Sequence, residues 1–196
     1  MRTQEGQARS LNNQEFQQVI DYTLSTSRYP LRDAAILAVS YYCGLRVMEI
    51  AELELGDILN SDGEIKQTVT LRRAATKGTK GGFAYFSNPL LRELLSKYIV
   101  EVRSLKSTEV STVFISKHLK QFSKSSLSRH MGTLYRKAGY EGCTGYTGRR
   151  SLGRNLNRNG VSVFNIQKIL RHSDIKTTQR YIDVDEEMLA NLVSSV

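Results

Sequence analysis

Four side chains in the last third of the chain have the chemistry needed to act on a phosphate group. Two adjacent arginines, Arg149 and Arg150, are followed by His172 and, nine positions later, by Tyr181. An arginine guanidinium is a planar fork of donors that matches two phosphate oxygens. An imidazole can move a proton, and a phenol can attack as a nucleophile. Together these residue types indicate phosphoryl transfer.

A tyrosine that attacks phosphorus forms a covalent phosphotyrosine, which conserves the energy of the phosphodiester bond for rejoining. Because a free phenol has a pKa of about 10, nearby positive charge must help it to lose its proton. Converging arginines would stabilise charge on the phosphate oxygens without a metal. The sequence contains no carboxylate cluster or histidine pair at metal-ligand spacing, so neither a metal nor a cofactor is expected.

Two more candidates for this chemistry come from the first half of the chain. Arg46 lies at the expected junction of two helices, where a long side chain can project into a cleft, and Glu49 could orient its guanidinium. Lys77 and Lys80 lie in a Gly-rich tip between two expected strands, where a lysine could protonate the leaving sugar oxygen. From charge alone, this basic tip is either part of a site or a solvated loop.

Composition restricts the class of protein. With 196 residues, 40% of them hydrophobic, the chain can form one domain with a sizeable core. A net charge of +9 favours a nucleic-acid partner, although a solvated basic surface is the alternative. No apolar run approaches the roughly 20 residues of a membrane span, and the N-terminus lacks the apolar core of a secretory signal. We therefore expect a cytoplasmic protein with no membrane partner, in which Cys43 is a buried free thiol.

Hydrophobic spacing predicts a mainly helical fold with one small β-hairpin, an α+β class. Residues 31–42 are apolar nearly all round, which is typical of a buried core helix. Gly44 is expected to cap its C-terminal end, and Thr144 or Thr147 to cap the N-terminus of a later helix. The expected strands are near 68–72 and 83–86, and the expected helices, apart from a short one after Arg46, are 11–25, 31–42, 90–103, 123–137, 148–159, 163–170, 174–181 and 186–192.

The predicted helix 123–137 combines an apolar face with a polar, basic one that includes Arg129. Such a face can lie along a DNA groove, or it can be the solvated side of an ordinary amphipathic helix. The sequence leaves both interpretations open.

Three stretches resemble the catalytic domain of the tyrosine recombinases, the phage integrase family. They read G-L-R-V-M-E-I-A-E-L at 44–53, T-K-G-T-K at 76–80 and L-R-H-S-D-I-K-T-T-Q-R-Y at 170–181. The last is the most specific, because it resembles the family's L-G-H followed by S-x-x-x-T-T-x-x-Y. The three stretches occur in the family's order and span nearly the whole chain.

The resemblance implies a catalytic role for each matching residue. By this resemblance Arg46 and Arg149 would bind the phosphate, and Lys77 would be the general acid. His172 would hydrogen-bond the scissile phosphate, and Tyr181 would be the nucleophile. Lys80 is the alternative to Lys77 as the hairpin lysine.

Three departures of this chain from the family pattern bear on the chemistry. The family's H-x-L-R-H reads Y-T-G-R-R here, so Tyr146 stands at the usual histidine position and Arg150 replaces the second histidine. A phenol cannot shuttle protons near neutral pH as an imidazole can, so we expect Tyr146 to donate a hydrogen bond to the phosphate and cleavage to be slower. Arg171 replaces the glycine that usually precedes His172. The cations expected to contact DNA are Lys80, Arg129, Arg150 and Arg171.

The resemblance implies a site-specific DNA recombinase of the integrase, excisionase or invertase type. It would cleave and rejoin double-stranded DNA through a 3′-phosphotyrosine, as a homo-tetramer on DNA that accessory proteins can assist. We expect residues 1–10 to be a flexible segment and 11–196 a single catalytic domain, without the family's N-terminal core-binding domain. The chain is then either a short, single-domain recombinase or a fragment of a longer protein. An apolar stripe in 186–192 resembles the family's C-terminal helix, which docks on a neighbouring subunit, although packing within the chain is the alternative.

Two other functions share part of this pattern. One is a catalytically weak or inactive relative that binds DNA as a regulator, which the tyrosine at position 146 favours and the retained catalytic residues oppose. The other is a strand-relaxing topoisomerase, against which the integrase-like spacing of 170–181 argues.

Overall fold

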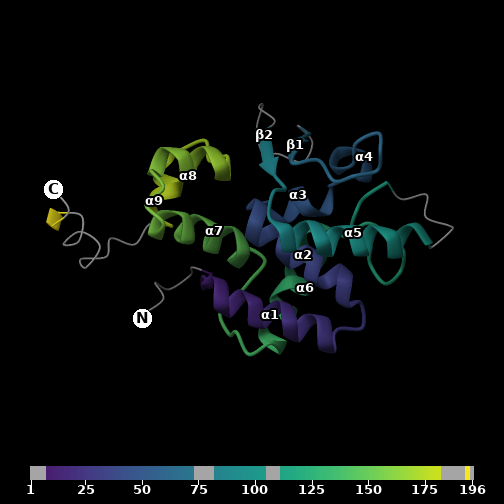
Figure 1. The fold of residues 1–196 in the computed structure, drawn as a ribbon. Coiled ribbons are helices and arrows are strands. Elements are labelled where there is room, and N and C mark those ends of the chain that lie inside the picture. The colour runs from purple at the N-terminus through teal and green to yellow at the C-terminus, as the bar shows by residue number, and fades with distance from the viewer. Residues whose placement is uncertain (1–7, 73–81, 105–110, 182–192, 195–196) are drawn as a thin grey trace.

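The structure is a computed structural model that describes residues 8–72, 82–104, 111–181 and 193–194. Within these ranges helices dominate, and the two strands form one small antiparallel sheet (Figure 1). This confirms the predicted mainly helical fold with a hairpin. No helix in the described ranges is long and apolar enough to cross a membrane.

The observed elements agree closely with the predicted ones. In chain order they are α1 (Asn13–Thr26), α2 (Pro30–Cys43), α3 (Val47–Ala51), α4 (Leu55–Ile58), β1 (Thr68–Leu71), β2 (Gly82–Tyr85), α5 (Pro89–Ser104), α6 (Lys124–Lys137), α7 (Thr147–Arg158), α8 (Val163–Leu170) and α9 (Ile175–Gln179). The separate turn α4 was not predicted. The predicted helix 186–192 lies outside the described residues.

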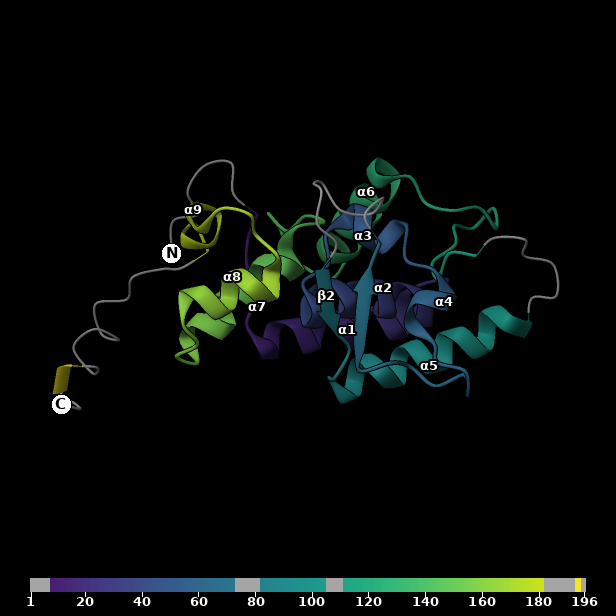
Figure 2. The same ribbon diagram turned by 90° about the horizontal axis from the view of Figure 1, so that it is seen from above.

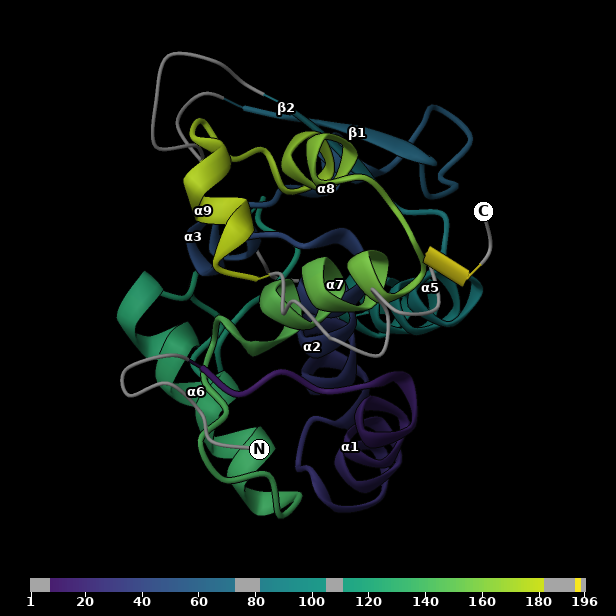
Figure 3. The same cartoon turned by 90° about the vertical axis from the view of Figure 1, so that its left-hand side faces the viewer.

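Helix α2 is the centre of the fold. Every residue from 34 to 39 has no exposed surface, as the apolar composition of this segment predicts. Figure 3 shows α2 between α7 and α1, both of which contact it, while α5 packs along another side. The helix ends at Gly44, whose φ of +60° is the left-handed conformation of a C-terminal cap. Cys43, just before this cap, is a buried free thiol as expected.

The hairpin lies at the top of the molecule in Figure 1, next to α4, and Figure 2 looks down on it from above. Its register pairs Thr68 with Tyr85 and Leu71 with Gly82. One face of the sheet is buried and the other carries exposed aromatic rings, which is the alternation expected of a half-buried antiparallel pair. The tip, with Lys77 and Lys80, lies outside the described residues.

The start of α7 differs from the prediction that a threonine caps it. The N-cap residue is Tyr146, and its side chain makes no capping hydrogen bond. Thr147 is already inside the helix, and its hydroxyl accepts a hydrogen bond from the Thr144 N–H at 2.9 Å. The prediction was wrong because the two threonines bind each other across the turn. Tyr146 is therefore held at the point where the turn enters the helix.

Helices α2 and α7 approach so closely that only glycine fits at position 148. A Cβ atom there would lie 2.6 Å from the Ser40 Oγ and 2.8 Å from the Tyr41 backbone N. We expect Gly148→Ala to lower the free energy of unfolding by about 1–3 kcal/mol, the usual effect of overpacking. Urea denaturation of the two proteins measures this difference.

Gly56→Ala is the matched control for that substitution. Gly56 is also helical, but a Cβ atom at this position would meet nothing within 4 Å. Alanine should leave stability unchanged or raise it by up to about 1 kcal/mol through helix propensity. Equal destabilisation by the two substitutions would contradict the close approach at Gly148.

Candidate active site

Three arginines from separate elements meet beside the C-terminal end of α2. Arg46 is the N-cap of α3, Arg149 lies in α7, and Arg171 follows α8. The Gly44 carbonyl accepts from the Arg149 Nη1 at 2.5 Å and from the Arg171 Nη2 at 3.2 Å. A helix C-terminus presents unpaired carbonyls with partial negative charge, so it attracts cations.

Glu49 is the carboxylate that holds these arginines together. Its side chain is fully buried, with Oε1 accepting from the Arg46 Nη1 at 2.7 Å and Oε2 from the Arg171 Nη2 at 2.9 Å. Burial acts to raise the pKa of Glu49, but Arg171, the Arg46 N–H, and the charges of Arg46 and Arg149 outweigh it. The pKa therefore lies below its usual value and Glu49 is ionised at neutral pH. The prediction that Glu49 orients Arg46 is confirmed.

Arg149 is the buried arginine of the group, with 2% of its surface exposed. Its two terminal nitrogens donate to the carbonyls of Gly44 and Leu170, which end α2 and α8. Burial, followed by the charges of Arg46 and Arg171, lowers the pKa of Arg149 to about 9. The guanidinium thus stays cationic at neutral pH, in surroundings where its field is weakly screened.

Arg46 is the more accessible of the two predicted phosphate-binding arginines, with 30% of its side chain exposed. Its Nη1 binds Glu49, and its Nη2 donates to the Arg171 carbonyl at 2.8 Å. These bonds fix the plane of the guanidinium, so an arriving anion meets an oriented donor fork.

His172 lies among these cations, and its imidazole is held neutral. Its Nδ1 is 2.8 Å from the Thr178 Oγ1, and 9% of its surface is exposed. Burial first, and then the charges of Arg149, Arg46 and Arg171, lower the pKa of His172 to about 3. When the Thr178 hydroxyl donates to Nδ1, Nε2 carries the hydrogen and can donate it to a phosphate oxygen.

Tyr181 lies directly beside His172. The two ring centroids are 5.3 Å apart and the rings are inclined at 66°. The Tyr181 N–H donates to the Thr178 carbonyl at 2.8 Å, which extends the last turn of α9 to the tyrosine. The guanidinium of Arg150 lies 5.9 Å from the centre of the Tyr181 ring, and Gly153 leaves room for that ring against α7.

The remaining predicted residues take different places. Tyr146 is 45% exposed at the N-terminal end of α7, three residues before Arg149. Arg171, an expected DNA contact, is turned into the protein, where 10% of its side chain is exposed. Lys77 and Lys80 lie outside the described residues. The next described residue is Gly82, which lies beside Arg171.

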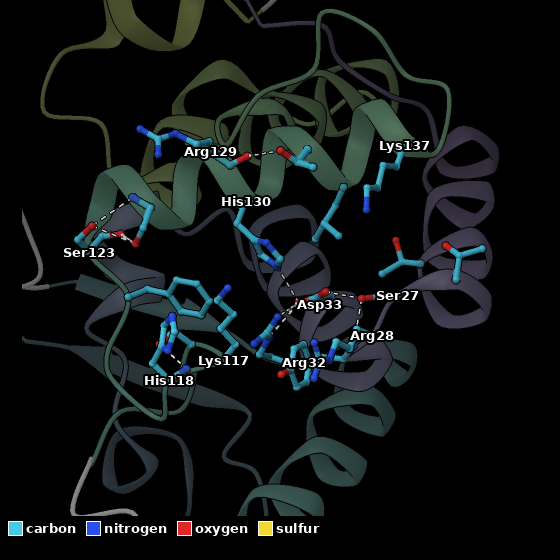
Figure 4. Close-up of a pocket in the computed structure, with 18 of the residues that line it drawn as sticks. Ser27, Arg28, Arg32, Asp33, Lys117, His118, Ser123, Arg129, His130 and Lys137 are labelled. Atoms are coloured by element: carbon cyan, nitrogen blue, oxygen red, sulfur yellow. Dashed lines mark hydrogen bonds and ion pairs between the residues drawn. The ribbon is translucent and has the colours of Figure 1, made fainter.

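Arg129 is exposed on α6 and lines a pocket of about 820 Å³ between α6, the end of α1 and the start of α2 (Figure 4). The pocket's one acidic residue is Asp33, which the Ser27 Oγ contacts at 2.5 Å and the His130 Nε2 at 2.8 Å. The other charged residues lining it are basic: Arg28, Arg32, Lys117, Arg129 and Lys137. The polar face of α6 is therefore part of a basic surface, while Leu127, Met131 and Leu134 are buried as predicted.

Sequence reasoning missed two contributors to the site. Thr178 orients the His172 ring, and its position three residues before Tyr181 in a short helix was the available signal. No pattern of neighbouring residues predicted that the Arg171 side chain points into the protein, because its partners Phe83 and Glu49 lie far away in the sequence. Among the described residues, no group of histidine, cysteine, aspartate and glutamate side chains could hold a metal ion.

The chain is similar in sequence and in fold to known recombinases and integrases. The tyrosine recombinase XerD of Staphylococcus saprophyticus is 30% identical over 164 residues, which cover 82% of this chain and 53% of that protein. The crystal structure of XerA recombinase matches with a TM-score of 0.76 at 24% identity, over 95% of this chain and 64% of that one. The Tn1549 transposon integrase in complex with transposon right end DNA matches with a TM-score of 0.78 at 11% identity, over 100% of this chain and 68% of that one.

These similarities confirm the fold expected of a tyrosine recombinase catalytic domain. The chain spans about half the length of the curated relatives it matches. Residues 9–188 match the Phage integrase family profile, which accounts for nearly the whole sequence. The chain belongs to the phage integrase family.

Proposed function

We propose that this chain carries out the strand cleavage and rejoining of a site-specific DNA recombinase. The observation that carries the proposal is the meeting of Arg46, Arg149 and His172, from three separate elements, beside the Tyr181 ring. Similarity to tyrosine recombinases such as XerD, and to the structure of an integrase in complex with transposon DNA, supports the same assignment.

In the proposed reaction the scissile phosphate sits against the two guanidinium groups and the Nε2–H of His172. These donors stabilise the negative charge on the non-bridging oxygens of the phosphate. Tyr181 releases its phenolic proton to solvent and its oxygen attacks phosphorus, a P–O bond to tyrosine forms, and the P–O5′ bond breaks. The product is a 3′-phosphotyrosine and a free 5′-hydroxyl, and attack by a 5′-hydroxyl of the partner strand reverses the step.

The leaving 5′-oxygen takes a proton, which we assign to Lys77, with Lys80 as the alternative. Tyr146, exposed at the start of α7, donates a hydrogen bond to the phosphate in this scheme. Further cations extend the DNA contact in this scheme. They are Arg129, which is exposed on α6, Arg150, which is partly buried in α7, and Lys80. We further propose a cytoplasmic protein that acts as a homo-tetramer on double-stranded DNA, with accessory proteins where the site requires them.

Covalent capture tests this function. The protein is incubated with nicked duplexes of randomised sequence, in which loss of a short strand traps the cleaved state, and adducts that survive denaturation are isolated and sequenced. We expect specific adducts with the wild type and none with Tyr181→Phe, because phenylalanine keeps the packing and lacks the attacking oxygen. Tyr22→Phe, an exposed tyrosine in α1, should form adducts normally.

The alternative function has a distinct outcome in this experiment. A protein that binds a specific duplex tightly but forms no adduct with it would be a DNA-binding regulator. An adduct that persists in Tyr181→Phe would place the nucleophile at another residue. Tyr146→Phe should still form the adduct, more slowly, since it loses one hydrogen bond to the phosphate.

A further inference from the structure

We propose that Arg171 is a positioning residue that couples the lysine-bearing hairpin to the phosphate-binding arginines. This role rests on the proposed function, because it concerns the placement of the general acid in the same reaction. The argument depends on where Arg171 sits, what its guanidinium binds and what those partners support.

Arg171 occupies a backbone position that favours glycine. Its φ is +54°, in the left-handed region, at the C-terminal cap of α8. A residue with a Cβ atom is less stable there than glycine by about 1 kcal/mol. The strain must be offset by contacts that the side chain makes elsewhere.

The guanidinium of Arg171 bridges four segments of the chain. Nη1 donates to the Phe83 carbonyl in β2 at 3.2 Å and to the Ile169 carbonyl in α8 at 3.0 Å. Nη2 donates to the Gly44 carbonyl at the end of α2 at 3.2 Å and to Glu49 in α3 at 2.9 Å. One side chain thus joins the hairpin to both helix ends that frame the site.

These contacts and the burial of the side chain leave Arg171 no donor that can reach DNA. A guanidinium has five N–H groups, and four of them can serve the four acceptors just described. The fifth, on Nε, is buried and has no hydrogen-bond partner among the described residues. With 10% of the side chain exposed, Arg171 acts on the reaction through other residues.

The hairpin contact lies where β2 leaves the lysine-bearing tip. The aliphatic part of Arg171 packs on Gly82, the first residue of β2, so closely that a Cβ atom at Gly82 would lie 2.6 Å from the Arg171 Cδ. Residues 73–81, which include Lys77, directly precede this point. Fixing the strand at Gly82 and Phe83 therefore fixes one end of the segment that carries the proposed general acid.

The same side chain also reaches the phosphate-binding group. Arg171 and Arg46 bind opposite oxygens of the Glu49 carboxylate, and the Arg171 carbonyl accepts from the Arg46 Nη2. The hairpin, through Arg171, and the phosphate-binding Arg46 are thus both connected to the Glu49 carboxylate. Loss of the Arg171 guanidinium would release the hairpin while Arg46 keeps its own bond to Glu49.

A pair of substrates separates positioning of the general acid from a purely structural role. One is the ordinary nicked duplex, and the other carries sulfur in place of the bridging 5′-oxygen. A leaving thiolate is a far weaker base than an alkoxide, so its departure needs no proton donor. Single-turnover cleavage is measured on both at saturating DNA, together with the Kd for DNA and the thermal unfolding of each protein.

We expect Arg171→Met to slow cleavage of the ordinary substrate by about 10²-fold, since a general acid contributes that much and depends on its placement. On the sulfur substrate the variant should cleave at nearly the wild-type rate, as Lys77→Ala should. The Kd for DNA should not change. Arg158→Met, which removes an exposed arginine from α7, controls for the loss of one positive charge.

Gly82→Ala gives a second test that leaves every arginine of the site in place. The added methyl group forces β2 and the Arg171 side chain apart, so the same selective loss on the ordinary substrate is expected, even if Arg171→Met folds poorly. Equal losses on both substrates, an unchanged rate, or a raised Kd with an unchanged rate would each overturn the positioning role. A wild type that cleaves neither substrate would instead overturn the proposed function, and this role with it.

Discussion

Arg149→Lys should lower the rate of DNA cleavage by about 10²–10³-fold while the protein still folds. The lysine keeps the positive charge but loses the planar fork, so it cannot hold two carbonyls and a phosphate oxygen together. In the wild type, the two terminal nitrogens of Arg149 donate hydrogen bonds to the carbonyls at the ends of α2 and α8. These bonds fix the orientation of the guanidinium in the site. Single-turnover cleavage of the captured DNA sequence measures the loss.

Arg158→Lys is the matched control, because it makes the same exchange at an exposed position in the same helix. Its cleavage rate should equal that of the wild type. A rate for Arg149→Lys within tenfold of the wild type would mean that charge alone suffices at this position. The geometry of the fork would then carry little of the catalysis.

Glu49→Gln should lower the free energy of unfolding by about 3–5 kcal/mol, the usual result of removing one partner from a buried ion pair. The amide cannot neutralise Arg46 and Arg171, and it offers one acceptor oxygen where the carboxylate uses two. Cleavage should fall as well, because Arg46 loses the bond that orients it. Urea denaturation and single-turnover cleavage measure the two effects.

A surface pair provides the control for Glu49→Gln. Glu93 and Lys97 form an ion pair on α5 with more than half of each side chain exposed. Glu93→Gln should change stability by no more than about 0.5 kcal/mol. Equal losses from the two substitutions would show that burial of Glu49 adds nothing to its contribution.

The effect of Glu49 on stability has a defined dependence on pH. The pKa of Glu49 is lower in the folded protein than its usual value, so its contribution is present above the unfolded pKa. That contribution is lost as pH falls through the folded pKa. The difference in stability between the wild type and Glu49→Gln should therefore be large at neutral pH and shrink in strong acid.

Much of the fold was predictable because its signals are local. The apolar segment of α2, Pro30 at its start and Gly44 at its end define that helix from neighbouring residues alone. The bond between Arg46 and Glu49 was predictable for the same reason, since residues three apart in a short helix meet. Local rules failed at Thr147, where two threonines bind each other and leave the cap to Tyr146.

The rest of the site depends on contacts that no local pattern encodes. Arg171 reaches the carbonyl of Phe83, 88 positions away, although the sequence led us to expect a contact with DNA. Outside the site, the Asp33–His130 pair likewise joins residues 97 apart and has no sequence signature. In each case the direction of a long side chain is decided by acceptors that come near only after the helices pack.

The end of α2 has a consequence for how the protein meets DNA. Like charges held about 4 Å apart near a protein surface repel by several kcal/mol, so gathering arginines is unfavourable in itself. Here the Gly44 carbonyl and the Glu49 carboxylate offset that repulsion during folding, before any phosphate is present. A phosphate that enters the proposed site would displace few existing contacts, and the arginines would not have to rearrange. Because the contacts at the end of α2 already hold the arginines in place, little reorganisation energy is left for the reaction itself.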